Sequence, residues 1–215
     1  MAPIKFWYSS GACSLAPHIV LHEAGIEFES VKLNVHAGYP EEFRQINPKM
    51  RVPVLSIDGQ IITEIPAIMT AISQLVPEKH FLGKTNLEIV RTYEWMNWLS
   101  GVLHGQAFGG LIRYYRYSDD TTTYPSIKAK ALLTVKECFA TINQDLSSEY
   151  AVGSNFTVVD AYLYVFYRWG ASLEIDMKEE YPKYTSLVVN LVKRQSAQAA
   201  LKAEGIAAHV VVPQL

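Results

Sequence analysis

The residue best placed to carry chemistry is a cysteine in a glycine-containing turn. Cys13 lies in Ser-Ser-Gly-Ala-Cys-Ser, residues 9–14, at the threshold of an apolar helix pattern. Free N–H groups and the helix dipole at such a position favour an anion, so the thiol pKa can fall well below about 8.5. Cys13 could then be a nucleophile, a redox thiol or the host of a substrate thiolate. Alternatively, Cys13 is simply a small buried residue at the point where a strand joins a helix.

Two hydroxyl groups near Cys13 are further candidate donors. Tyr8 ends the run before the turn, and Ser10 lies within it. Serine and glycine are also the residues that ordinary turns contain, so turn formation alone would explain Ser10.

A second stretch, residues 47–64, offers groups that suit a peptide-like ligand. Asp58-Gly59 separates two short apolar runs, which predicts a hairpin whose two turn residues have positive φ. Pro53 lacks an N–H and therefore belongs at the start or edge of its strand. It also holds Val52 extended, which leaves the backbone N–H and C=O of Val52 available for strand addition.

The hairpin leads into a helix with proline in its first turn. Glu64 precedes Ile65-Pro66, so its carboxylate would lie beside the free amides of that turn. The carboxylate can hold an ammonium group, and the amides can hold a carboxylate. This combination predicts a site for a zwitterionic peptide, although a plain hairpin feeding a helix has the same pattern.

His104 lies on a long helix pattern, with Asn97 seven residues before it and Gly101 three residues before it. At this spacing the three share one stripe. Because most of their neighbours are apolar, the stripe predicts either a core histidine or a polar face across a cleft. An aromatic and apolar group near the end of this pattern is either a ligand pocket or plain packing, and it comprises Phe108, Leu111, Tyr114 and Tyr115.

Several kinds of function find no support. The 215 residues carry a net charge of −2 without a basic block, which argues against nucleic-acid binding, and no apolar run reaches the length of a membrane span. His18 and His22 have helical spacing but no third metal ligand, and Cys13 and Cys138 are far apart, so no metal site is expected. Phosphate-loop and serine-hydrolase motifs are absent. We therefore expect a cytoplasmic protein with no membrane contact.

The elements that must position these residues follow from periodicity. Residues 3–8, 15–24 and 26–33 predict strand, helix and strand, with Gly25 closing the helix, and such a βαβ unit has parallel strands. A short helical segment over 40–46, the hairpin and a helix over 66–76 follow. The order β-α-β-α-β-β-α predicts a small α/β domain over residues 1–80.

The remaining chain predicts an all-helical domain over residues 86–215. Helix patterns cover 86–115, 124–149, 158–173 and 183–194, and the only later strand signal is Val210–Val212. Thr157 and Asp160 have the spacing of a capping box at the start of the third of these helices.

Four motifs together resemble the glutathione S-transferase family, most closely its bacterial beta class. Tyr8–Ala16 resembles the cysteine-bearing turn of that class. Asn47-Pro48-Lys49 with Val52-Pro53 resembles the loop before the family's cis-proline strand. Glu94–His104 resembles the class's long helix, and Phe156–Tyr162 with Arg168-Trp169 resembles its capping-box helix.

The resemblance implies a thioredoxin-like N-terminal domain followed by an all-α domain, usually as a homodimer. It implies glutathione as co-substrate, with its cysteinyl backbone paired to Val52, Pro53 cis, and its γ-glutamyl end at Glu64 and the Ile65 amide. Cys13 would lie beside the glutathione sulfur, and Asn97 and His104 would reach over from the helical domain.

Three departures from the family pattern accompany these matches. Ile65 and Gly101 stand where hydroxyl residues are common, and Met50-Arg51 replaces Gly-Gln. The hydroxyl lost at Ile65 corresponds to about one hydrogen bond, roughly 0.5–1.5 kcal/mol.

We therefore predict a detoxifying transferase that adds the glutathione thiolate to a small apolar or aromatic electrophile. Cys13, Ser10 or Tyr8 would supply the last hydrogen bond to the thiolate. Phe108, Leu111, Tyr114 and Tyr115 would line the second-substrate pocket. Two alternatives stay open: a glutathione-dependent thiol-disulfide oxidoreductase using Cys13, and a non-catalytic binding protein.

Overall fold

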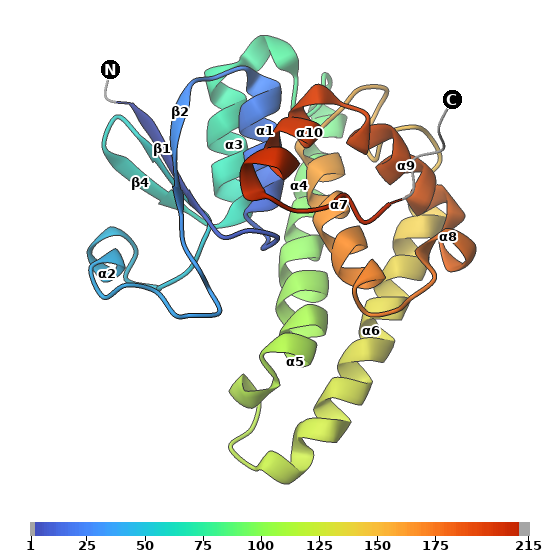
Figure 1. The fold of residues 1–215 in the computed structure, drawn as a ribbon. Helices are drawn as coiled ribbons and strands as arrows, with labels where there is room; N and C mark the ends of the chain where they lie inside the picture. The colour runs from blue at the N-terminus through green and yellow to red at the C-terminus, as the bar shows by residue number, and fades with distance from the viewer. Residues whose placement is uncertain (1–2, 211–215) are drawn as a thin grey trace.

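A four-stranded mixed sheet forms one side of the molecule (Figure 1). The computed structural model describes residues 3–210, and the sheet has the strand order β2-β1-β3-β4. The strands are β1 (Ile4–Tyr8), β2 (Phe28–Lys32), β3 (Val54–Ile57) and β4 (Gln60–Thr63). β1 pairs with β2 in parallel and with β3 antiparallel, as the predicted βαβ unit and hairpin require.

The parallel pair is joined by α1 (Leu15–Ala24), which ends where predicted. Gly25 adopts a left-handed φ of 69° and donates its N–H to the carbonyl of His22. This conformation costs glycine little because it has no Cβ. The hairpin turn also agrees with the sequence, since Asp58 and Gly59 have φ values of 49° and 78°.

Successive residues of a strand pack into two different hydrophobic cores, because side chains alternate between the two faces of a sheet. Phe6 and Leu55 point into the main core with α1 and α3 (Ile65–Leu75), whereas Trp7 and Val54 pack on the opposite face. That second face carries α2 (Phe43–Ile46). α1 and α3 lie between the sheet and the remaining helices (Figure 1).

The long helix predicted over 86–115 is present but changes its winding in the middle. α4 (Asn86–Trp98) continues as a π-helical segment, η2 (Leu99–Phe108), and then as α5 (Gly109–Ile112). A 3₁₀ turn, η3 (Tyr114–Arg116), follows. Extended π-helix is rare and cannot be read from apolar periodicity. Its wider turn changes which residues of the helix share a face.

α7 (Val158–Ala171) lies at the centre of the helical part, and nearly all of its residues are buried. The predicted capping box is confirmed: Thr157 accepts a bond from the Asp160 backbone, and the Thr157 N–H donates to Asp160 Oδ2 at 2.7 Å. α9 (Pro182–Val192) packs against it, and Phe139 of α6 (Tyr124–Asp145) lies against Gly170 near the end of α7. Both α6 and α9 are shorter than predicted at their C-terminal ends.

Two helices were not predicted, α8 (Met177–Glu180) and α10 (Gln195–Glu204). α10 packs along α1, far from it in sequence, and Figure 1 shows the two side by side. Short 3₁₀ turns also occur at η1 (Pro77–Lys79) and η4 (Thr121–Thr123). Of the strand predicted at Val210–Val212, Val211 and Val212 lie outside the described residues.

Among the helices of residues 3–210, none is long and apolar enough to cross a membrane. In the same range no three His, Cys, Asp or Glu side chains are grouped so that they could hold a metal ion.

Candidate functional site

A cleft of about 520 Å³ opens between the hairpin side of the sheet and the helical part. One wall comes from the loop before β3 and from the start of α3, the other from η2, the end of α5 and α7, and Cys13 lies between them. The first wall comprises Asn47, Lys49, Arg51, Val52, Pro53, Thr63, Glu64, Ile65 and Pro66, and the second comprises Ser100, His104, Gly105, Arg113 and Tyr162.

Cys13 is almost entirely buried and its thiol is protonated. Its Sγ donates to the carbonyl oxygen of Val52 at 3.7 Å. Burial raises the pKa of the thiol to about 11, although the Arg113 charge and the nearby backbone N–H groups act in the opposite direction. The expectation of a lowered pKa is therefore wrong for the ligand-free protein, because desolvation outweighs the helix N-terminus.

Val52 and Pro53 form the predicted ligand-facing edge of the first wall. The bond between them is cis. The preceding loop is held by Asn47, which is buried, donates its side-chain amide to Arg51 O at 2.8 Å and accepts the Lys49 N–H at 3.1 Å. This arrangement leaves the Val52 carbonyl pointing at Cys13.

Glu64 stands at the start of α3 with a positive φ of 71°. Its carboxylate is exposed and pairs with Lys49 Nζ at 2.7 Å, and Lys49 also donates to the Thr63 hydroxyl at 2.9 Å. Ile65 follows as the first residue of α3. The sequence motif contained Lys49, but its pairing with Glu64 was not predicted because they lie 15 residues apart.

His104 faces the cleft from the second wall and packs on aromatic rings, with its centroid 5.5 Å from that of Trp169. Burial, followed by the charges of Arg113 and Arg51, lowers the pKa of His104 to about 4. The imidazole is therefore neutral at pH 7 and brings no positive charge to the cleft.

The predicted stripe of Asn97, Gly101 and His104 is wrong. Asn97 and Gly101 are exposed, and the helix presents Ser100, His104 and Gly105 to the cleft instead. The π-helical winding, with its i→i+5 bonding, places residues four and five apart on one face. Ser100 was missed although it lies four residues before His104, a spacing that an ordinary helix also places on one face. Its hydroxyl lies 3.2 Å from that of the buried Tyr162, which was also missed.

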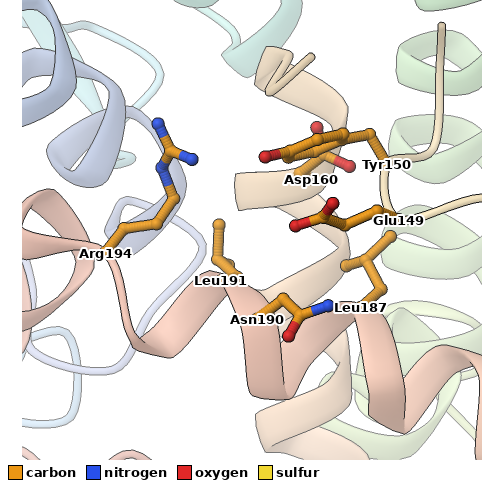
Figure 2. A pocket seen from close by; sticks show the side chains of 7 residues that line it. All are labelled: Glu149, Tyr150, Asp160, Leu187, Asn190, Leu191 and Arg194. Atoms are coloured by element: carbon orange, nitrogen blue, oxygen red, sulfur yellow. The ribbon is translucent and has the colours of Figure 1, made fainter. Parts of the chain in front are cut away.

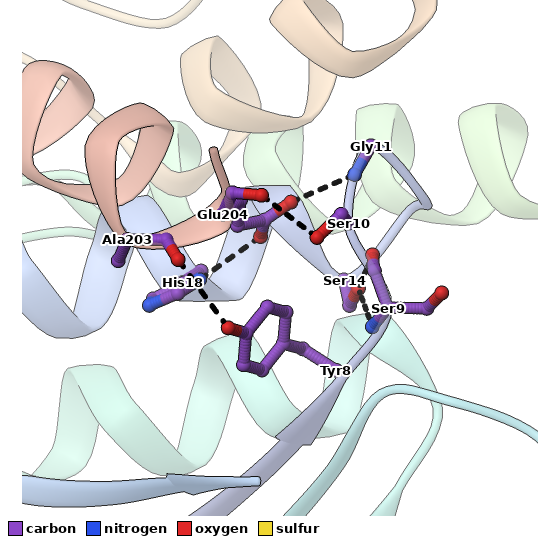
Figure 3. Close-up of polar contacts among 8 residues, drawn as sticks. All are labelled: Tyr8, Ser9, Ser10, Gly11, Ser14, His18, Ala203 and Glu204. Carbon is purple, nitrogen blue, oxygen red and sulfur yellow. Dashed lines mark hydrogen bonds and ion pairs between the residues drawn. The ribbon is translucent and has the colours of Figure 1, made fainter. Parts of the chain in front are cut away.

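Tyr8 and Ser10 do not line the cleft, and their hydroxyl groups bond to α10 instead (Figure 3). The Tyr8 hydroxyl donates to Ala203 O at 3.5 Å, and the Ser10 hydroxyl donates to Glu204 O at 2.8 Å. Both acceptors belong to α10, the helix that the sequence did not predict. The expectation that Tyr8 or Ser10 could donate to a thiolate beside Cys13 therefore fails on geometry.

The carboxylate of Glu204, at the end of α10, also holds the turn at residues 9–14. It accepts the Gly11 N–H at 2.8 Å and lies 2.9 Å from Nδ1 of His18, and both Glu204 and His18 are buried (Figure 3). Trp169 donates its indole N–H to Gly11 O at 2.9 Å. The backbone before Cys13 is thus held by two helices.

The predicted second-substrate pocket is not found where expected, because none of its four residues lines the cleft. Phe108 is buried and stacks on Phe166, with 5.8 Å between centroids. Tyr114 packs between Tyr115 and Tyr124 at the tip of the helical part. Leu111 packs against the main core. The segment contributes Arg113 to the cleft instead.

A second, much smaller cavity of about 30 Å³ lies beside the capping box (Figure 2). It is lined by Glu149, Tyr150, Asp160, Leu187, Asn190, Leu191 and Arg194. Asp160 is buried there, and desolvation raises the pKa of its carboxyl to about 6 although it accepts the Ala151 N–H at 2.8 Å. The other hydrogen bonds of Asp160 are those of the cap, so this cavity belongs to the structural part of α7.

Comparison with known proteins decides the family. The family models for the glutathione S-transferase N-terminal and C-terminal domains match residues 2–74 and 113–195. The curated glutathione S-transferase GstA of Escherichia coli O157:H7 is 30% identical over 209 residues, covering 94% of this chain and 100% of its own. The chain belongs to the glutathione S-transferase family.

Solved structures of family members agree with this assignment. A sphingomonad glutathione S-transferase complexed with glutathione is 35% identical with a TM-score of 0.83, covering 94% of this chain and all of its own. A beta-class glutathione S-transferase from Sphingomonas chungbukensis is 34% identical with a TM-score of 0.82 and the same coverage. The fold and the family that the motifs indicated are both confirmed.

Proposed function

We propose that this glutathione S-transferase family member conjugates glutathione to a small electrophile in the cleft around Cys13. The observation that carries the proposal is the cleft itself. It brings the Val52 backbone edge, Glu64 and the start of α3 opposite His104 and Arg113, with a thiol between them. The 35% identical sphingomonad protein, whose structure holds glutathione, supports the choice of ligand.

Glutathione would lie along the first wall. Its cysteinyl backbone pairs with Val52, displacing the Cys13 thiol from the Val52 carbonyl. The γ-glutamyl ammonium approaches the Glu64 carboxylate, and the γ-glutamyl carboxylate meets the free N–H groups at the start of α3, where Ile65 supplies an amide but no hydroxyl.

The residues around the sulfur then lower the pKa of the glutathione thiol. Cys13 stays protonated at pH 7, so its S–H donates a hydrogen bond to the glutathione thiolate. The guanidinium of Arg113 adds a positive charge that already acts on the Cys13 sulfur. Because His104 is neutral, its ring nitrogen can orient the ligand by a hydrogen bond, but the residue adds no positive charge.

The reaction itself needs little more than a positioned thiolate. The glutathione thiol releases its proton to solvent, and its sulfur forms a C–S bond to the electrophilic carbon. In a substitution, the leaving group departs with the pair of electrons of its bond. In an addition to an activated double bond, the neighbouring carbon takes up a proton.

The state of Cys13 favours conjugation over thiol-disulfide exchange. In exchange, the attacking species is the thiolate. A buried thiol whose pKa is about 11 is almost wholly protonated at pH 7, which makes Cys13 a better donor than nucleophile.

The assembly and location follow from other parts of the chain. We propose a homodimer formed through a face that includes Leu87 and Val90 of α4, which are 65% and 60% exposed. Ile61 and Leu75, on the neighbouring β4 and α3, are also exposed. We propose the domain division at residues 80–86 and a cytoplasmic location, where Cys13 and Cys138 would stay reduced.

A conjugation assay with chlorodinitrobenzene and reduced glutathione tests this function. Wild-type protein is expected to turn over, and Cys13→Ala to lose about tenfold in kcat/KM, the value of one charge-assisted hydrogen bond. Cys138→Ala is the matched control, since Cys138 is a buried cysteine of α6 that does not line the cleft. No turnover by folded wild-type protein that binds glutathione would favour the non-catalytic alternative.

A further inference from the structure

Arg113 stands out among the residues of the cleft. It follows α5 directly, where its backbone N–H donates to Gly109 O at 2.8 Å and ends the helix. Its side chain lines the cleft and is half-buried. The guanidinium is close enough for its charge to act on both the Cys13 thiol and the His104 imidazole. Arg113 therefore shares the cleft with the Cys13 sulfur.

Nothing in the described part of the chain neutralises this guanidinium. Residues 3–210 contain no ion pair and no side-chain hydrogen bond to Arg113. The carboxylate of the same cleft, Glu64, is paired with Lys49. The guanidinium is partly desolvated by burial and keeps its five N–H donors free for an anionic ligand.

The position of Arg113 distinguishes it from the other cations of the cleft. Lys49 and Arg51 belong to the first wall, the side proposed for glutathione, and Arg51 is exposed. Among the residues that line the second wall, Arg113 alone is charged at pH 7, because His104 is neutral there. The electrophile must approach the glutathione sulfur from this wall.

We propose that Arg113 binds a carboxylate on the electrophilic co-substrate, so that the preferred electrophiles are small organic acids. The inference rests on the proposed function and replaces the predicted apolar pocket with a charged one. A guanidinium suits this task because its planar fork can give two parallel hydrogen bonds to one carboxylate. The thiolate and the anchored acid would then meet in a fixed orientation.

A matched pair of electrophiles makes the proposal testable. In a chlorodinitrobenzoate with its carboxylate para to chlorine, the glutathione sulfur forms a C–S bond, the C–Cl bond breaks and chloride leaves with the bonding pair. The corresponding carboxamide reacts in the same way and has nearly the same shape but no charge. Their two S-aryl glutathione conjugates differ only in this group.

The decisive measurement is the affinity of the two conjugates, because it requires no turnover. Calorimetric titration of the full chain gives the ratio of the two dissociation constants. Wild-type protein is expected to bind the carboxylate conjugate at least about tenfold more tightly than the carboxamide conjugate. In Arg113→Gln this preference should disappear, and in Arg113→Lys part of it should return.

Arg116→Gln is the matched control, since it removes the same charge three residues away. Arg116 is exposed, lies beside the Tyr115 ring and does not line the cleft. In Arg116→Gln the ratio of the two dissociation constants should equal that of wild type. A change seen only in the Arg113 variants then reflects a local contact rather than the net charge of the protein.

Three results would overturn the proposal. Equal affinities in wild type would mean that no carboxylate anchor exists. An unchanged preference in Arg113→Gln, with both affinities as in wild type, would place the anchor elsewhere. An equal loss for both conjugates would assign Arg113 to glutathione, which both contain. Turnover of the two chlorides tests the proposed function separately: binding with the expected preference but without conjugation defeats only that function.

Discussion

The turn at residues 9–14 has two sides that differ in how their polar groups are satisfied. On the α10 side, Ser10 and Gly11 both donate to Glu204, and His18 contacts the carboxylate of Glu204. On the cleft side, Cys13 has one long contact to Val52, and Arg113 has no side-chain partner in residues 3–210. The bonded groups on the α10 side hold the fold, whereas Cys13 and Arg113 on the cleft side remain open to a ligand. The predictions below test this distinction.

The largest effect is expected from the α10 side. Glu204→Ala removes one partner of a buried pair and leaves the Gly11 N–H without an acceptor. The unfolding free energy should fall by about 3 kcal/mol or more. Urea denaturation measures it, with Glu94→Ala as control because Glu94 forms only an exposed pair with Arg91. A loss no larger than that of the control would contradict the structural role.

On the cleft side, Cys13 should react slowly with alkylating agents. Burial raises the pKa of its thiol from 9.0 to about 11, so the thiolate fraction at pH 7 falls by about 100-fold. The alkylation rate, followed by mass spectrometry, should rise steeply only as the pH approaches about 11. Rapid modification at pH 7 would show that the thiolate is stabilised after all.

His104 should stay neutral in mildly acidic solution. Its pKa falls from 6.5 to about 4, since burial and the nearby arginines oppose the imidazolium. The unfolded chain therefore takes up this proton first, and stability present above pH 6.5 is lost progressively as the pH falls to about 4. Proton NMR of the His104 ring gives the midpoint. A value of 6.5 or higher would refute this electrostatic description.

The smallest effect is expected at Tyr8. Its hydroxyl makes only a 3.5 Å contact to Ala203 O, away from the cleft. Tyr8→Phe should therefore change conjugation by less than about twofold, in contrast to Cys13→Ala. A loss as large as that of Cys13→Ala would return Tyr8 to the reacting centre and erase the difference between the two sides.

The features predicted correctly are those encoded within a few residues. Asp58-Gly59 specifies its turn through local backbone preference, and Gly25 ends α1 for the same reason. The Thr157–Asp160 capping box is equally local. Each of these features can be predicted from a single sequence, because the residues that produce it are close together in the chain.

The features missed depend on contacts between distant residues. α10 is rich in alanine and ends at Gly205, which are helix signals that the prediction overlooked. Its contact between Glu204 and Gly11, 193 residues apart, has no signal in the sequence. The π-helical winding of η2 adds Gly105 to the cleft face, and the burial of Cys13 reverses its expected pKa shift. Each outcome is set by tertiary packing, which overrides local preference.

The central claim is that the unsatisfied side of the turn faces a glutathione site, and calorimetric titration with reduced glutathione tests it most directly. We predict one molecule bound per chain, with affinity reduced about tenfold or more in Glu64→Ala through loss of the ammonium partner. Glu94→Ala, which removes an equally exposed carboxylate from α4, should bind as wild type does. Absence of saturable binding at millimolar glutathione would contradict the account.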